Sequence, residues 1–193
     1  MLLFCNLPEQ KKKRKSLKIE ENLFFRIAQN DMSALEELYH LTDKTVYAFA
    51  MSILKNTQDA QDVMQETYLK IKAGAHLYQP KGKPLAWILT IVKNLSLMKI
   101  RSYKKFCEDS DNELKNLADT SNFIDTEDKI IMQSLLNTLT EEERQIIILH
   151  IVSGMKHIEI AKFLNLNLST ELSKYNRSLK KLKKILMEGG YEM

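Results

Sequence analysis

Apolar residues recur every three or four positions through most of this sequence, which is the spacing that lines up side chains on one face of an α-helix. The clearest stripe joins Ala60, Val63, Thr67 and Ile71. Runs that alternate apolar and polar residues, as strands do, are few. Further stripes predict helices over about 20–29, 33–54, 84–105, 126–136, 141–153, 157–164 and 170–186.

Residues that commonly begin or interrupt helices stand at the ends of these stripes. Thr57 is expected to cap the helix that follows it, and Pro84 to begin the next one. Thr140 and Glu143 form a capping box, in which each side chain binds the backbone N–H of the other residue. A break in the long helix before Thr57 is expected near Thr42–Asp43.

Two short helices, a turn and a long basic helix are predicted one after another between residues 139 and 186. Ser169 or Thr170 is expected to cap the last of them. Between residues 168 and 184 this helix carries six basic residues and one acid, Glu171. The arrangement is that of a helix-turn-helix, whose second helix enters the DNA major groove. The alternative is a solvated helix that closes a small bundle.

Composition supports an all-α protein with two domains. The chain has 193 residues, 44% of them hydrophobic, but only 5 Gly and 3 Pro. Between residues 107 and 129 eight acids stand against two bases, with few large apolar residues, which is typical of a linker. We therefore expect two helical domains joined by an acidic flexible linker, the C-terminal one a helix-turn-helix. The predicted divisions are a disordered basic arm over 1–19, an N-terminal helical domain over 20–106, the linker over 107–126 and the C-terminal domain over 127–193.

The charge is modest in total, at +4, but it is strongly segregated along the chain. Basic residues cluster over 11–18, 93–105 and 174–184, whereas acids cluster over 108–128. Such segregation fits a protein that binds a polyanion better than a uniform surface would. The basic run near the N-terminus is also compatible with a solvated arm.

Catalytic and metal-binding patterns are not found in the sequence. The two cysteines, Cys5 and Cys107, show no zinc spacing with the four histidines, and no P-loop is present. We expect no enzyme activity, no cofactor and no metal. No apolar run approaches the length of a membrane span, so we expect a cytoplasmic protein without membrane insertion.

The helix expected after Thr57 has a polar face opposite its apolar stripe. That face is acidic and rich in glutamine, and it would repel DNA phosphates. It therefore suits a protein partner with a basic surface, although an ordinary solvated face is the alternative. Its members are Gln58, Asp62, Gln65 and Glu66, with Asp59 beside them.

The loop over 74–84 and the helix after it carry a second group of polar residues. His76, Tyr78 and Gln79 combine rings with an amide, and Lys83 adds a cation. Such groups can hold an unstacked base by stacking and hydrogen bonding, although any helix connection uses similar loops. The helix that begins at Pro84 adds five basic residues and no acid over 93–105.

These features, in this order, resemble the sigma-70 family of bacterial RNA polymerase initiation factors, specifically its small two-domain extracytoplasmic-function (ECF) type. The segment 59–68 is similar to the part that docks on the polymerase clamp helices. The segments 83–89 and 93–95 are similar to the promoter-melting and −10-recognition part. The stretch 139–179 is similar to the −35-recognition module, and the whole resemblance covers about residues 31–186.

The resemblance implies roles for particular residues. It implies that the following residues bind polymerase: Asp59, Asp62, Gln65 and Glu66. It implies −10 contacts from His76, Tyr78, Gln79, Lys83, Trp87, Lys93, Asn94 and Arg101. It implies −35 contacts from Ser169, Thr170, Ser173, Lys174, Arg177 and Lys181. The implied partners are core RNA polymerase, through its clamp helices and flap, and promoter DNA, with an anti-sigma factor as a further candidate.

Three positions depart from the family pattern. Met98 stands where the −10 helix usually has an acid, and Asn165 where the helix-turn-helix usually has a glycine. Glu171 stands where a small apolar residue is usual, so Leu172 is a candidate to take over that contact. Two other classes of protein remain as alternatives: a conventional helix-turn-helix regulator that binds an operator without polymerase, and a helical adaptor that binds only proteins.

Overall fold

The computed structural model describes residues 17–109 and 137–188, and these residues form two compact units. Helices account for the regular structure of both units, and no strand occurs in the described ranges. This confirms the all-α prediction. The arm over 1–16, most of the expected linker and the helix expected over 126–136 lie outside the described residues.

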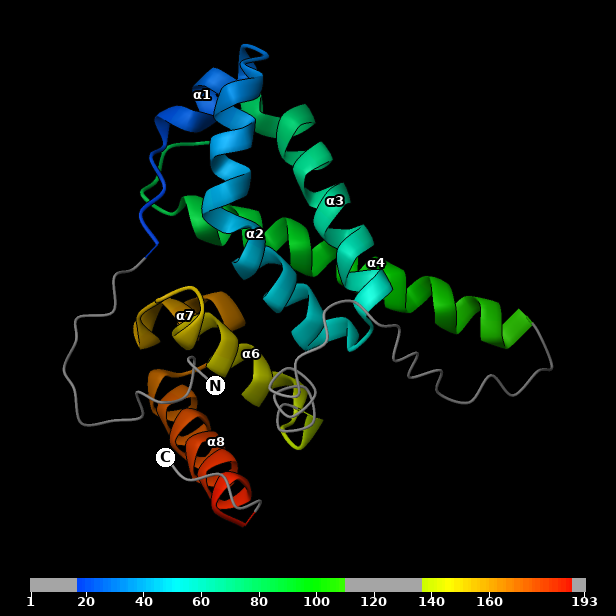
Figure 1. Cartoon of the computed structure of the whole chain (residues 1–193), viewed down its shortest axis with the longest axis vertical. Helices are drawn as coiled ribbons and strands as arrows, with labels where there is room; N and C mark the ends of the chain where they lie inside the picture. Colours follow the sequence, from blue (N-terminus) through cyan, green and yellow to red (C-terminus); the bar gives the residue numbers. More distant parts are fainter. Residues whose placement is uncertain (1–16, 110–136, 189–193) are drawn as a thin grey trace. The chain divides into compact units, whose positions relative to one another are not determined.

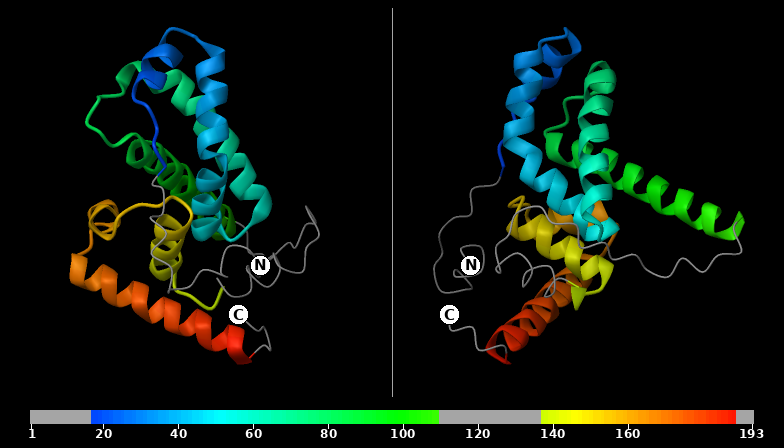
Figure 2. Two further views of the ribbon diagram at one scale, coloured as in Figure 1. Left: turned by 60° about the vertical axis from the view of Figure 1, so that its left-hand side comes forward. Right: turned by 45° about the vertical axis from the view of Figure 1, so that its right-hand side comes forward.

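Between residues 17 and 109 the N-terminal unit contains four α-helices and one short 3-10 helix, and a loop joins the 3-10 helix to the last α-helix (Figure 1). Their bounds are α1 Asn22–Ala28, α2 Met32–Leu54, α3 Thr57–Gly74, η1 Ala75–Leu77 and α4 Pro84–Asp109. The three long helices pack on one another, with α4 crossing the other two (Figure 2). Their apolar stripes meet in a core whose fully buried side chains include Leu38, Phe49, Ile71, Ile88 and Leu89.

The expected break near Thr42–Asp43 is wrong, because α2 runs through it without interruption. Thr42 Oγ1 donates to the carbonyl oxygen of Leu38 at 2.7 Å, so the hydroxyl is satisfied inside the helix. The same hydroxyl lies 2.8 Å from the Tyr68 hydroxyl on α3. A polar residue in a helical stripe therefore marks a buried hydrogen bond between α2 and α3.

Two helix starts were predicted correctly, but the positions of other helix ends differ. The capping box of Thr140 and Glu143 is present, and Pro84 begins α4. The cap of α3 is Asn56 instead of Thr57, because the Asn56 side chain accepts from the backbone N–H of Asp59 at 2.9 Å. The helix α4 extends to Asp109, so it includes the first residues of the expected linker.

In the described part of the C-terminal unit, α6 Glu141–Ile151, α7 His157–Leu164 and α8 Leu168–Glu188 pack pairwise. Leu139, Ile147 and Leu182 form its buried cluster. Asn165 ends α7 in the left-handed conformation, with φ 57°, as its place in the turn requires. Ser169 and Thr170 lie within the first turn of α8 and do not precede it, because that helix begins at Leu168.

Candidate nucleic-acid and protein interfaces

The acidic face of α3 divides into a part that packs on α4 and a part that remains exposed. Asp59 is buried, and its carboxylate accepts a hydrogen bond from the Tyr103 hydroxyl at 2.8 Å. Lys99 on α4 lies 3.0 Å from Asp59 and 2.6 Å from Asp62. Burial alone would lower the pKa of Lys99, but its hydrogen bonds to the two carboxylates raise that pKa above the ordinary value. Asp59 therefore holds α3 to α4.

The exposed part of that face consists of Gln58, Asp62, Gln65 and Glu66. Leu69 follows four residues after Gln65 and three residues after Glu66, so it lies beside them on the helix surface. Its side chain is 68% exposed, although leucine is usually buried. Sequence reasoning missed this residue, because it falls outside the apolar stripe. An exposed leucine next to an amide and a carboxylate is a surface suited to a protein partner.

A pocket of about 380 Å³ opens where the loop after η1 meets the start of α4. Trp87 is half-buried in its wall, and Gln79 and Lys83 are exposed at its edge. Leu77, also in the lining, is 68% exposed. The full lining is Leu77, Tyr78, Gln79, Lys81, Lys83, Ala86, Trp87 and Thr90.

Tyr78 contributes to this pocket from the core instead of from the surface. It is only 8% exposed, and its ring stacks on Phe24 with a centroid separation of 4.1 Å. Its hydroxyl donates to Glu21 at 2.6 Å. Trp87 meets both rings edge-on, at 5.3 Å from Phe24 and 5.4 Å from Tyr78. Tyr78 thus supports the pocket, while the Trp87 ring and the loop amide supply its accessible chemistry.

The face of α4 beyond the pocket continues the same surface. Trp87, Thr90, Asn94 and Arg101 follow at steps of three, four and seven residues, which keeps them on one side of the helix. Asn94 and Arg101 are exposed. Met98 lies four residues after Asn94 and is 61% exposed, so this side carries a neutral residue there. The remaining candidates differ in place: Lys93 is half-buried, and His76 is exposed but does not line the pocket.

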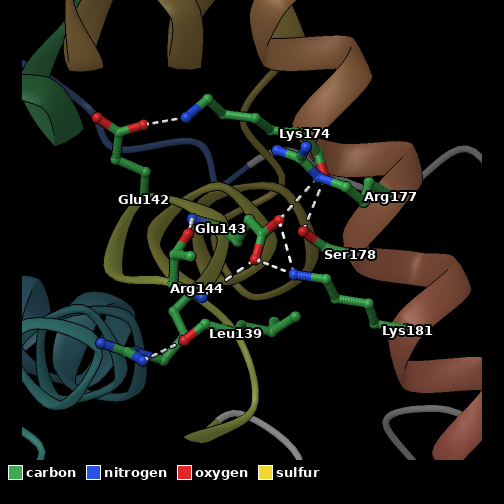
Figure 3. Close-up of polar contacts among 9 residues, drawn as sticks. Leu139, Glu142, Glu143, Arg144, Lys174, Arg177, Ser178 and Lys181 are labelled. Carbon is green, nitrogen blue, oxygen red and sulfur yellow. Dashed lines mark hydrogen bonds and ion pairs between the residues drawn. The ribbon is translucent and has the colours of Figure 1, made fainter.

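Three of the basic residues that the family resemblance implies as −35 contacts form ion pairs with acids of α6 (Figure 3). Lys174 forms an ion pair with Glu142. Arg177 Nε donates to Glu143 at 3.0 Å, and Lys181 Nζ lies 2.9 Å from the other oxygen of that carboxylate. Burial raises the pKa of Glu143, but the hydrogen bond from Lys181 and the one from the Thr140 N–H outweigh it and hold the pKa at about 2.

The exposed positions of α8 include neutral polar residues as well as basic ones. Ser169, Thr170 and Ser173 are exposed, as the sequence analysis requires of residues that contact DNA. Asn176 and Lys180 are exposed at the next turns of the same helix, and they are not among the contacts predicted from the sequence. Their spacing of three and seven residues from Ser173 was the signal that could have found them.

Glu171 does not lie on this exposed side, because its side chain is fully buried. One of its oxygens lies 2.9 Å from His157 Nδ1 on α7. The other oxygen has no hydrogen-bond partner among the described residues. The His157 ring stacks on His150 at 4.1 Å, and Tyr175 meets both rings edge-on. The departure at Glu171 thus joins α7 to α8 from a buried position.

No group of three His, Cys, Asp or Glu side chains in the described part of the chain could hold a metal ion. None of the helices in that part is both long enough and apolar enough to cross a membrane.

Two sequence models of one family match the chain. The model of sigma-70 region 2 matches residues 38–106, and that of sigma-70 region 4 matches residues 129–182, which together is more than half of the chain. The ECF RNA polymerase sigma factor SigK of Mycobacterium bovis (strain BCG / Pasteur 1173P2) is 28% identical over 176 residues, covering 85% of this chain and 91% of the relative. The protein of that name from Mycobacterium sp. (strain KMS) is 24% identical over 173 residues, covering 85% and 89%.

Two solved structures share the fold. CnrH, in complex with the cytosolic domain of CnrY, matches with a TM-score of 0.63 and 21% identity over 87% of this chain and 97% of its own. The sigma factor RpoE from Bartonella quintana, in complex with the anti-sigma factor NepR, matches with a TM-score of 0.65 and 24% identity over 79% and 96%.

Proposed function

The chain belongs to the sigma-70 family, as a sigma factor of the ECF type and thus a transcription initiation factor that recognises promoters, and from this premise we propose a role for each of its surfaces. The roles concern polymerase docking, the −10 element and the −35 element. The initiation steps draw on binding energy alone, so the protein is not an enzyme.

The exposed part of the α3 face docks on core polymerase. Gln65, Glu66 and Leu69 offer an amide, a carboxylate and an apolar side chain, in that order, within about one turn. A basic, partly apolar groove such as that of the clamp helices is the complementary surface. Asp62 contributes from the edge, while Asp59 acts indirectly by holding α3 on α4 through Lys99.

The pocket at the start of α4 receives a base from the melted −10 element. The observation that carries this proposal is the lining, which combines the Trp87 ring, the Gln79 amide and two lysines in about 380 Å³. An unstacked base needs a ring to stack on and a polar group to read its edge, and its phosphate needs a cation. Asn94 and Arg101 continue along α4 to hold the strand, and Met98 leaves that path without a repelling acid.

The exposed side of α8 reads the −35 element in the major groove. Ser169, Thr170, Ser173 and Asn176 can exchange hydrogen bonds with base edges, and Lys180 can neutralise a phosphate. Lys174, Arg177 and Lys181 reach phosphates only to the extent that their pairing with α6 allows. The flap of polymerase is a further partner of this unit.

The family membership suggests the compartment, and the similar solved structures suggest a further partner. Transcription initiation places the protein in the cytoplasm. The solved neighbours bind anti-sigma factors or partner domains, so an anti-sigma factor is a proposed partner here too. Such a partner would act by covering the surfaces that bind polymerase or DNA.

Run-off transcription with purified core polymerase on a promoter library tests the docking role. Glu66→Arg should abolish the sigma-dependent transcripts, because it puts like charges together at the interface. The matched control is Glu36→Arg, which makes the same charge change at a 73% exposed position on α2. Normal transcription by Glu66→Arg would refute the docking role. Specific binding of duplex promoter by the protein alone, without polymerase-dependent transcripts, would instead favour a conventional helix-turn-helix regulator.

A further inference from the structure

Glu21 ties the loop beside the pocket to the start of the N-terminal unit. It immediately precedes α1, 57 residues before Tyr78 and 61 before Gly82. A single carboxylate oxygen of Glu21 accepts from the Tyr78 hydroxyl at 2.6 Å and from the Gly82 N–H at 2.8 Å. The loop residues that line the pocket, Gln79 and Lys81, lie between these two attachment points. Glu21 therefore fixes both ends of this wall.

The backbone of the loop is shaped to make this contact. Gly82 has a φ of +67°, a left-handed conformation that glycine adopts without strain. That conformation accompanies a backbone N–H aimed at the Glu21 carboxylate. A hydrogen bond to an ionised carboxylate is stronger than one between neutral groups, so it can hold a short loop in one shape.

The other attachment point is rigid as well. The Tyr78 ring is stacked on Phe24 of α1, and Trp87 meets both rings edge-on. Burial, together with the hydrogen bond to Glu21, raises the pKa of the Tyr78 hydroxyl, so it stays a donor throughout the neutral range. Glu21, Phe24, Tyr78 and Trp87 thus connect α1, the loop and α4 around one pocket.

We propose that Glu21 is a positioning residue that sets the shape of the base-binding pocket and thereby the base preference of this sigma factor at one −10 position. It does so without contacting DNA, by keeping Gln79 and Lys81 where an unpaired base can enter. Because a preformed site avoids the cost of ordering its loop on binding, loss of the attachment weakens base capture. This inference rests on the proposed capture of a base by the pocket.

The test uses holoenzyme assembled from core polymerase and the full chain. Promoter duplexes carry the fluorescent base 2-aminopurine singly at each −10 position, and a parallel set carries each natural base there. Wild-type holoenzyme should give one position of strong fluorescence increase with a clear base preference. Glu21→Ala should reduce both by about tenfold, the factor expected when one or two hydrogen bonds that preorganise a site are lost.

Three further variants separate positioning from general damage. Glu21→Gln keeps an acceptor oxygen and should restore most of the base preference. Tyr78→Phe keeps the ring packing but removes one donor, and it should add little to Glu21→Ala because both break the same attachment. Glu20→Ala is the matched control, since it removes the neighbouring exposed carboxylate. Base preference at the −35 element should stay unchanged in all of them.

The outcomes distinguish this inference from the function on which it rests. If wild-type holoenzyme shows no fluorescence increase and no base preference at any −10 position, the pocket does not capture a base. If wild type shows both, yet Glu21→Ala and Tyr78→Phe behave like Glu20→Ala, the positioning role of Glu21 is overturned. Equal losses at the −10 and −35 elements would also overturn it, because they would indicate general unfolding.

Discussion

At the scale of single residues, Glu143 both caps α6 and holds the basic side chains of α8. Its side chain is 1% exposed, yet it is ionised, because it caps α6 and also binds Arg177 and Lys181 of α8. Burial of a charge is tolerated only where partners replace the lost water, and here three donors do so. The same carboxylate thus begins one helix and orients the basic side chains of another.

The depressed pKa of Glu143 makes its contribution to stability dependent on pH. With a folded pKa of about 2 against an ordinary 4.5, the contribution is fully present above pH 4.5 and is lost as the pH falls toward 2. Glu143→Gln should therefore lower the free energy of unfolding by about 1–2 kcal/mol at neutral pH. Urea titrations at several pH values check this, and the difference from wild type should vanish near pH 2. A constant difference across the range would contradict it.

The Glu171–His157 contact should show the asymmetry of a hydrogen bond that satisfies a buried polar group. His157→Ala leaves the fully buried carboxylate without its partner and should cost about 2 kcal/mol. The double variant His157→Ala/Glu171→Ala removes the unpaired group as well and should be more stable than His157→Ala alone. Thermal unfolding of the two variants measures this order. The reverse order would mean that Glu171 finds other partners.

Gly82 should resist substitution for a backbone reason. A Cβ added there would meet nothing within 4 Å, so crowding is no obstacle. Its φ of +67° is nevertheless costly for any residue with a side chain. Gly82→Ala should lower the free energy of unfolding by about 1–2 kcal/mol or change the shape of the loop. Urea unfolding measures the first effect, and the −10 fluorescence assay measures the second. Gly74→Ala, also with nothing within 4 Å of its Cβ and without positive φ, is the matched control.

At the scale of helices, α8 separates two kinds of side chain onto two sides. One side carries Lys174, Arg177 and Lys181 toward the acids of α6 (Figure 3). The other side carries Ser173, Asn176 and Lys180 in exposed positions. The ion pairs of the first side fix the helix on α6, and the proposed contact with DNA falls mainly to the second side. A count of basic residues alone would not distinguish the two.

This division predicts different effects of two lysine substitutions. Lys180→Ala should weaken promoter binding by the holoenzyme and reduce the slope of log affinity against log salt by about 0.9, as expected for one lost phosphate contact. Lys174→Ala should change the slope less, because that lysine already pairs with Glu142. Binding isotherms at several salt concentrations make the comparison. Equal slopes in the two variants would show that the α6 pairing is given up on DNA.

At the scale of the whole molecule, each unit closes its own core. Apolar side chains from α2, α3 and α4 fill the first, while Leu139, Ile147 and Leu182 form the buried cluster of the second. Separate cores fit the proposal that each unit binds its own promoter element. They also match the order of the family's two conserved regions along the chain.

Separate cores predict that the N-terminal unit folds without the other. A fragment of residues 17–109 should give a helical circular dichroism spectrum and a cooperative thermal transition, because its buried side chains are supplied within it. Calorimetry of the fragment beside the full chain measures this. A fragment that melts without cooperativity would show that its core depends on the rest of the protein.

The sequence by itself determined the helices, their order and the class of function. Helical spacing, the capping box and Pro84 are local signals, so they could be read without a structure. The family resemblance followed from motifs in order, and the exposed places of Gln65, Glu66, Ser169 and Ser173 agree with the proposed surfaces.

Only the tertiary structure decided which polar residues are engaged within the protein. Asp59, Tyr78 and Glu171 look like surface residues in the sequence, yet packing buries them against Lys99, Phe24 and His157. Glu21 carries no local signal at all, because its partners lie about sixty residues away. Helical periodicity reports which side of a helix is apolar. It does not report which polar side chain will meet a partner from a distant helix, and that pairing settles where the accessible site remains.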